Sequence, residues 1–396
     1  MREKGYLKHI ISSIALEDNA LIESLSGNSN RMAFVYVHES RMALLNTLAR
    51  TRHGSRALIE AGLMSKLAHC KFIDSRPVPS AMGDDDNDST RLHRYRLLLF
   101  PVLRLVMGLQ STLGGSNDNL QQLTLNFVLN HLDGFSAPLF SSRAEPPTDK
   151  EYLEEIHLIT SVLCIIAGHD FTISGVGGVT DVALRQVTLQ QNKIQRLLFS
   201  LISNYILTES WINRAGPAAY LEAQRTSTNV IQTARQIILN ACYKNDDKGS
   251  PIIFSTNLGS ETIHGNEDPP LGLIIKLLKE STHNFTETIQ KRSSQQRKLD
   301  NVAGLPTVTL DELAGVADLS YENQGERPSL HQKQQLAKLT LTSDIELSDK
   351  LLSVQHKQLE STLFILWRHI EYYLNTAPNK PQVSLSARKL QAVHAI

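Results

Sequence analysis

An acidic run is the first stretch whose residue types could do chemistry. In "GDDDND", at positions 83–88, three aspartates stand at alternate positions, the spacing with which an EF-hand loop presents carboxylates to calcium. That loop also needs glycine at its sixth position and a bidentate glutamate at its twelfth, where this sequence has Ser89 and Tyr95. We therefore interpret 83–88 as a solvated acidic loop without a metal.

A glycine-rich stretch, "SGVGGVTD" at 174–181, precedes a predicted helix. The N-terminus of a helix can hold a phosphate group. However, the stretch lacks the third glycine of a dinucleotide fingerprint, no G-K-[ST] follows, and no strand–helix–strand pattern surrounds it. We interpret it as a connection between helices and predict no bound cofactor.

Histidine is plentiful, with 14 copies, but its spacing does not indicate a metal site. The sequence contains no H-E-x-x-H, and His38–Glu39 and His369/Glu371 lack a second ligand at helical spacing. A G-x-S-x-G elbow is also missing, and no cysteine stands in a Cys–His pattern that marks an activated nucleophile. These patterns predict a protein that is not an enzyme.

The three cysteines, Cys70, Cys164 and Cys242, lie far apart and form no C-x-x-C pair. Each lies in an apolar helical stretch, where a free thiol behaves as a small hydrophobic side chain. Their placement predicts free thiols in a reducing compartment.

Composition limits the kinds of partner. The 40 basic and 40 acidic residues cancel in a chain of 396 residues, so no overall field attracts nucleic acid or anionic lipid. The N-terminus does not read as a signal peptide. The longest apolar runs, 97–109 and 156–167, are shorter than a bilayer span, and Pro101 and Arg104 interrupt the first. We expect no direct nucleic-acid binding and no transmembrane segment.

Apolar residues recur at spacings of three and four along most of the chain, which predicts an all-α protein. Between 33 and 50 we expect Val37, Leu44, Leu45 and Leu48 to face inward. The stretch "SRALIEAGLMSKLAHC" predicts two short helices hinged at Gly62, with further inward positions at Leu58, Ile59, Leu63, Leu67 and Cys70.

Capping signals suggest where further helices begin. Pro217 and Pro270 suit the first helical turn, while Asp149 and Asp344 could accept hydrogen bonds from unpaired amides. The predicted helices are 92–113, 119–131, 150–167, 179–207, 217–243, 270–292 and 345–376, and the predicted loops are 74–89, 141–148, 245–269 and 318–335.

Long helices joined by loops, in a chain too large for one simple bundle, favour an irregular α-solenoid of the armadillo/HEAT-like kind. A pair of helical bundles is the alternative, because no strict 34- or 40-residue repeat is present. We divide the chain into helical segments 1–140 and 141–244, a loop at 245–269, and a C-terminal helical segment at 270–396.

The aromatic stretch "LFILWRHIEYYL", 363–374, raises the question of what it faces. An apolar stripe at helical spacing is usually core. We therefore expect its broad face to be buried, with Ser361 on the opposite side, and Trp367→Ala to cost about 3 to 5 kcal/mol. The predicted buried face comprises Leu359, Leu363, Leu366, Trp367, Ile370, Tyr373 and Leu374. The alternative is a protein-interaction face at Trp367, Arg368, Tyr372 and Tyr373.

Six strings together resemble the large inner-ring scaffold nucleoporin family. They occur in the family's order and span nearly the whole chain, with a looser match from 141 to 266. The strings are "GYLKHII", "VYVHESRMALLNTLART", "GLMSKLAHCKFIDSRP", "HRYRLLLFPVLRL", "LGLIIKLLKEST" and "TLFILWRHIEYYL".

This resemblance implies a C-terminal part of an α-helical solenoid that acts as a structural scaffold in the inner ring of the nuclear pore complex, at the nuclear envelope. The implied partners are other nucleoporins, namely a nucleoporin 93-class adaptor and a nucleoporin 35-class linker, bound by helix-in-groove contacts. The alternatives are an armadillo/HEAT-like transport receptor or cargo adaptor, which needs a regular repeat, and a hydrolase or metal-dependent enzyme, which needs clustered polar groups.

Overall fold

A computed structural model describes residues 5–25, 32–77, 85–114, 118–141, 149–169, 209–243, 271–304 and 330–376, with a few separate residues between 189 and 198. Every regular element in these ranges is helical, which confirms the all-α prediction. Helix length is uneven, from five residues in α5 to 47 in α14. The described helices therefore form an irregular solenoid without a uniform repeat.

The helices have the following bounds: α1 Tyr6–Leu16, α2 Asp18–Leu25, α3 Met32–Ala49, α4 Arg52–Glu60, α5 Leu63–Leu67, the 3-10 helix η2 Lys71–Asp74, α6 Asp85–Leu113, α7 Asp118–Asn130, α8 Leu132–Ser141, α9 Lys150–Gly168, α11 Glu209–Tyr243, α12 Leu271–Gly304 and α14 Leu330–Thr376.

Two predicted local signals, the Asp149 cap and the Gly62 hinge, are confirmed, and the structure adds a cap at Thr51. Asp149 caps α9 by accepting hydrogen bonds from the amides of Glu151 and Tyr152, at 3.3 and 3.1 Å. Thr51 caps α4 by accepting from the Gly54 amide at 3.1 Å. Gly62 adopts a left-handed conformation, φ 81°, between α4 and α5, a backbone geometry that glycine reaches without steric penalty.

Several predicted boundaries are wrong because long helices run through them. Pro217 lies inside α11, and Asp344 lies well inside α14. The predicted loops 74–89 and 318–335 end early, since α6 begins at Asp85 and α14 at Leu330. The acidic run therefore enters the first turn of α6. The glycine-rich stretch 174–181, most of the predicted helix 179–207 and the predicted loop 245–269 lie outside the described residues.

Helix α6 also continues through Pro101. Proline removes the amide that would bind the carbonyl four residues earlier. Separately, Asn46 of α3 donates to the Pro101 carbonyl at 3.1 Å, which ties α3 to α6. By length and composition the part of α6 from Ser89 to Leu113 could cross a bilayer, although most of it is buried inside the protein. It is packed as the core helix of a helical stack.

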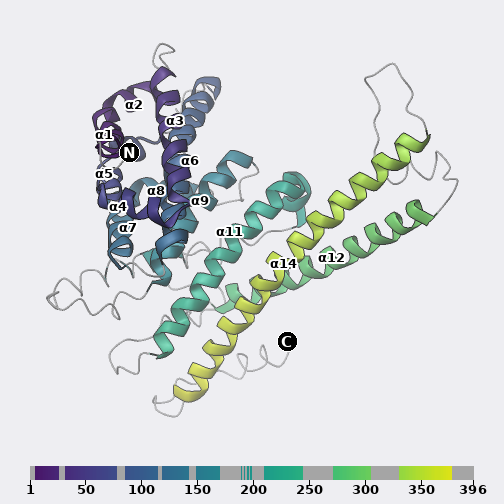
Figure 1. Cartoon of the computed structure of the whole chain (residues 1–396). Helices are drawn as coiled ribbons and strands as arrows, with labels where there is room; N and C mark the ends of the chain where they lie inside the picture. Colours follow the sequence, from purple (N-terminus) through teal and green to yellow (C-terminus); the bar gives the residue numbers. More distant parts are fainter. Residues whose placement is uncertain are drawn as a thin grey trace.

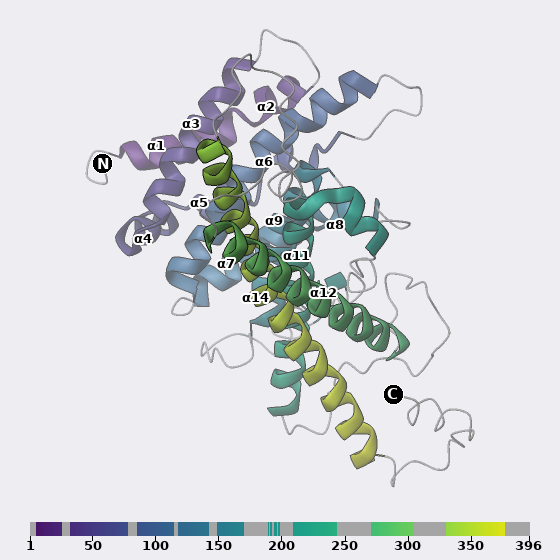
Figure 2. The same cartoon turned by 90° about the vertical axis from the view of Figure 1, so that its right-hand side faces the viewer.

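The N-terminal helices gather into one body, and three long helices form a second layer (Figure 1). Helix α9 lies between them, contacting α6 on one side and α11 on the other. Helices α12 and α14 pair along much of their length and extend beyond the rest of the molecule, as the view turned by 90° also shows (Figure 2).

One apolar core runs through the N-terminal body into the ends of α11, α12 and α14. Its largest fully buried side chains include Tyr95, Phe72, Phe127 and Phe135. A second, smaller cluster lies further along the long helices and includes Leu153, Ala219, Ala223 and Leu351. The long helices therefore meet the rest of the chain at two apolar contacts.

Between these contacts, α11 and α14 meet through polar side chains. The Tyr220 hydroxyl accepts hydrogen bonds from Gln224 Nε2 at 3.1 Å and Gln355 Nε2 at 2.9 Å. One turn along, Gln358 Nε2 donates to Ser227 Oγ at 3.3 Å. All five side chains are buried. We call these residues the polar seam.

Candidate functional site

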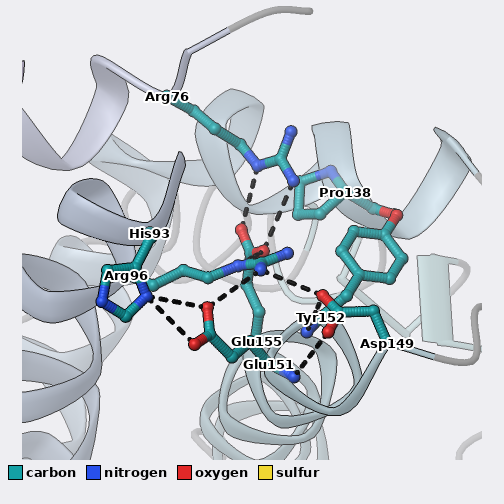
Figure 3. Close-up of polar contacts among 8 residues, drawn as sticks. All are labelled: Arg76, His93, Arg96, Pro138, Asp149, Glu151, Tyr152 and Glu155. Carbon is teal, nitrogen blue, oxygen red and sulfur yellow. Dashed lines mark hydrogen bonds and ion pairs between the residues drawn. The ribbon is translucent and has the colours of Figure 1, made fainter. Parts of the chain in front are cut away.

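The most heavily charged buried site is centred on Glu155 of α9, which has no exposed surface (Figure 3). Its carboxylate accepts from Arg76 Nε at 2.9 Å and from Arg96 Nε at 3.1 Å. Arg76 follows η2, and Arg96 lies on α6. One carboxylate therefore joins three segments that are far apart in the sequence.

Further acidic groups complete the neutralisation of Arg96. Its Nη1 donates to Asp149 Oδ2 at 3.1 Å and to Glu151 Oε2 at 3.3 Å. Glu151 also lies 3.0 Å from His93 Nδ1, on the exposed side of the cluster (Figure 3). The N-cap of α9 and the buried ion pair thus share one guanidinium group.

Tyr152 lies beneath both guanidinium groups, with Arg76 Cζ 6.0 Å and Arg96 Cζ 5.7 Å from the ring centroid. Its hydroxyl donates to the Pro138 carbonyl at 2.6 Å, which ties α8 to α9. Arginines stacked on an aromatic face gain cation–π attraction as well as ion pairing. We call Arg76, Arg96, Glu155 and Tyr152 the arginine clamp.

The electrostatics of the clamp favour structure over catalysis. Burial acts to lower the pKa of Arg76, but the hydrogen bond and the charge of Glu155 outweigh it and leave that pKa above its ordinary value. A catalytic acid or base needs a proton it can exchange near neutral pH. The clamp instead holds its charges in mutually neutralising pairs.

Three other buried titratable side chains are held in their neutral forms at neutral pH. Burial lowers the pKa of His38 to about 4, so its ring is neutral, and Nε2 donates to the Leu98 carbonyl at 3.3 Å. Burial raises the pKa of Cys70 and of Cys164 to about 12. Both thiols are free and protonated at neutral pH, as an unreactive buried cysteine should be. The side chain of Cys242 lies outside the described residues.

The clamp was not foreseen from the sequence, although a signal was present. Glu155 lies among the apolar positions of α9, next to Ile156 and one turn from Ile159. A carboxylate on the buried side of a helix needs a cation to compensate for desolvation. The two arginines could not be chosen from the sequence, because they come from distant segments.

The predicted inward stripe of α3 is only partly correct. Leu45 is fully buried, but Val37 is 48% exposed and Leu44 is 36% exposed. The helix turns a neighbouring side inward, with Val35, His38 and Met42 in the core. By contrast, four of the inward positions predicted around Gly62 are buried, namely Leu58, Leu63, Leu67 and Cys70.

The aromatic helix turns part of its predicted buried side outward, although Leu366 of that side packs partly buried against the core. Trp367 is 65% exposed and Leu363 is 52% exposed, whereas Ser361 and Thr362 are fully buried. The expectation that Trp367 packs in the core is therefore wrong. The polar seam explains the difference, since small and amide side chains of α14 match those of α11 and leave the bulky side outward.

Two arginines flank this outward side. Arg235 of α11 lies over the Phe364 ring, with Cζ 4.9 Å from the centroid, and pairs with Glu360 at 2.9 Å. Arg368 lies over the same ring at 5.5 Å. Tyr372 and Tyr373 lie on the last part of α14, and their side chains lie outside the described residues. Exposed tryptophan beside arginine is typical of protein-binding surfaces.

These features define a class: an irregular helical scaffold with an ion-paired body and an apolar outer helix face. Comparison with known proteins then shows what the chain is similar to. Residues 1–167 match the family described as nuclear pore complex scaffold, nucleoporins 186/192/205. The chain is 27% identical to "Nuclear pore complex protein Nup205" of Homo sapiens, over 98% of this chain, and 24% identical to the Drosophila melanogaster protein of the same title, over 94% of it.

Both comparisons confirm the resemblance seen in the sequence: residues 1–167 are similar to the nuclear pore scaffold family, and most of the chain is similar to the two Nup205 proteins. The match covers 20% of the human protein and 18% of the fly protein. The chain thus spans about one-fifth of the length of these relatives, and what the whole proteins do is a separate question.

Proposed function

We propose that the chain is a structural scaffold segment of the nuclear pore complex inner ring, at the nuclear envelope, corresponding to a C-terminal part of the solenoid. The observation that carries this proposal is similarity to a nuclear pore protein over 98% of the chain. Its contribution to pore assembly and nucleocytoplasmic transport would be binding rather than catalysis, in keeping with the closed ion pairs of the clamp.

The partners we propose are other nucleoporins, in particular segments of the nucleoporin 93-class adaptor and the nucleoporin 35-class linker. The candidate face is Trp367, Arg368, Tyr372 and Tyr373. Supporting it are the exposure of Trp367, Leu363 and Ile370 at helical spacing, and the arginine beside them. Such a stripe suits an amphipathic helix of a partner.

A binding assay with purified segments tests both statements. Immobilised nucleoporin 93-class and nucleoporin 35-class segments are titrated with the wild-type chain, Trp367→Ala and Leu339→Ala. Leu339 is the matched control, because it is 69% exposed on the same helix but far from the candidate face. We expect saturable wild-type binding, at least about tenfold weaker binding for Trp367→Ala, and no change for Leu339→Ala.

Two results would contradict the proposal in different ways. Equal binding of Trp367→Ala and wild type would remove the candidate face but leave the scaffold role. Failure of the wild-type chain to bind either segment would remove the adaptor contacts from this part of the protein.

A further inference from the structure

Helix α3 is apolar on two sides, and the described residues cover only one of them. Val35, Met42 and Leu45 are buried on the inner side. Phe34, Val37 and Leu44 are 38%, 48% and 36% exposed on a second side, at the i, i+3 and i+10 spacing that aligns side chains along a helix. A helix that is apolar on two sides is expected to be covered on both.

An ion pair interrupts this second side and fixes its shape. Arg41 lies between Val37 and Leu44 and binds Glu17 with two parallel hydrogen bonds of 3.0 Å. The paired side chains are only 12% and 27% exposed. Leu16, directly before Glu17, is 80% exposed.

A cationic corner follows at the end of α3. Arg50, Arg52 and Arg56 are exposed, and none of them forms an ion pair with another described residue. The sequence from 40 to 59 contains no aspartate or glutamate, and Glu39 and Glu60 stand at its two ends. Because the whole chain has a formal charge of zero, this corner is a local excess of positive charge rather than part of a general basic character.

The corner is also rigid. The Thr51 cap fixes the start of α4, and a side chain at Gly54 would place its Cβ 2.1 Å from the Leu48 carbonyl oxygen. The backbone at Gly54 therefore packs closely against the end of α3. This packing keeps Arg50, Arg52 and Arg56 near the end of the apolar side. Figure 1 shows α3 and α4 together in the N-terminal body, on different helices from the candidate face of α14.

We infer that the outer side of α3 and this corner form a docking surface for an amphipathic helix of another protein, with acidic residues at one end. The apolar positions from 34 to 44 span about 15 Å along the helix axis, the length of roughly three helical turns. Guanidinium groups pair with carboxylates in a fork geometry. Charge complementarity therefore selects a partner helix whose acidic end lies over Arg52 and Arg56.

An anionic membrane is a poorer occupant of the same surface. Glu17 places a carboxylate in the middle of the apolar area and already neutralises Arg41. A lipid headgroup layer would meet that carboxylate, whereas a helix can lie beside it. The inference deepens the proposed scaffold function, because it adds a second binding surface for a partner protein.

The test uses a defined probe, an 18-residue helical peptide with leucines along one side and four glutamates at one end, and a matched peptide with four lysines instead. Binding to the full chain is measured by fluorescence anisotropy at low and physiological salt. We expect the glutamate peptide to bind and the lysine peptide to bind at least tenfold more weakly. Val37→Asp and the double variant Arg52→Glu/Arg56→Glu should each weaken binding at least tenfold.

Ala43→Asp is the matched control, because it adds the same charge to an exposed position on another side of α3. It should leave binding unchanged, as should Trp367→Ala, which keeps this test independent of the adaptor assay. Circular dichroism confirms that each variant folds. The inference is overturned by equal binding of both peptides, by no binding of the glutamate peptide, or by an equal effect of Val37→Asp and Ala43→Asp.

Two other occupants are read out in parallel, and either would also overturn the inference. A self-association of the chain that Val37→Asp abolishes, seen by sedimentation, would assign the surface to a second copy. Binding to phosphatidylserine vesicles that needs Arg52 and Arg56, without peptide binding, would assign it to a membrane.

Discussion

Helices α1 to α9 and the layer of α11, α12 and α14 are held together by different chemistry. The first group closes around an apolar core and the arginine clamp, where charged groups are fully paired. The long helices share the end of that core and a second, smaller apolar cluster, and between these α11 meets α14 through the polar seam. A buried amide or hydroxyl adds modestly to the free energy of unfolding when it is hydrogen-bonded, and it lowers that free energy when it has no partner.

The arginine clamp and the polar seam differ in how fully their buried polar atoms are paired. In the polar seam, Gln224 Oε1 and Gln355 Oε1 are buried without a partner among the described residues, as are His38 Nδ1 and Gln121 Oε1 in the N-terminal body. In the clamp, both oxygens of Glu155 are used. We therefore expect α14, with α12 paired to it, to separate from α11 at the polar seam more readily than the arginine clamp opens.

The largest expected effect comes from breaking the clamp. Glu155→Gln leaves two arginines without their buried counter-charge, and we expect a loss of about 3 to 5 kcal/mol in the free energy of unfolding. Urea unfolding followed by circular dichroism measures it. Glu154→Gln is the control, since its pair with Arg104 is solvent-exposed and should be worth less than about 1 kcal/mol. Equal losses would contradict the special role of the clamp.

A second pair of variants compares the two sides of α14. Ile365 is 1% exposed, so Ile365→Ala should lower the free energy of unfolding by about 2 to 5 kcal/mol. Trp367→Ala, two residues away on the outer side, should change it by less than about 0.5 kcal/mol. Thermal unfolding of both variants gives the ranking, and a reversed order would return Trp367 to the core.

The third prediction concerns pH. The pKa of His38 is lowered by burial from 6.5 to about 4, so below pH 6.5 the unfolded chain binds a proton that the folded chain excludes. Stability should fall as the pH falls from 6.5 towards 4, by about 2 kcal/mol at pH 5 from this residue. Urea unfolding at pH 7 and pH 5 measures the difference.

His38→Gln should flatten that pH dependence, because the substituted side chain does not titrate. His53→Gln, at an exposed position, should leave it unchanged. His157, whose pKa is also lowered by burial, would supply a remaining slope of the same sign. An unchanged slope in His38→Gln would mean that the ring is not neutral in the core.

The smallest effect is expected in the polar seam. Tyr220→Phe removes the acceptor of two amide groups and should cost about 1 to 2 kcal/mol. Replacing the whole set with apolar groups, as Tyr220→Phe/Gln224→Leu/Gln355→Leu, should recover most of that loss. If the triple variant is much less stable than Tyr220→Phe alone, the seam is a stabilising network rather than a weak contact.

Sequence periodicity located most of the helices, but it predicted the buried side correctly for only some of them. The predicted helices 33–50 and 150–167 agree closely with α3 and α9, because their apolar spacing and the Asp149 cap are local signals. Trp367, Val37 and Leu44 were assigned inward because they are bulky and apolar. Which apolar side a helix buries depends on its neighbours, and this information is not local.

The candidate sites divide in the same way. The exposed aromatic helix could be singled out from its unusual composition, and its family resemblance could be read from whole strings. The clamp could not, since Arg76, Arg96 and Glu155 meet only after η2, α6 and α9 have packed. Similarly, Pro217 and Asp344 are good boundary signals that long-range packing overrides.

Hydrogen–deuterium exchange of the intact chain tests the contrast between the two parts most directly. The account predicts the slowest exchange in α6 and α9, around the clamp, and exchange at least about tenfold faster in the interior of α12 and α14 beyond the polar seam. Equal protection of all four helices, or slower exchange in the α12–α14 pair than in α6 and α9, would contradict it.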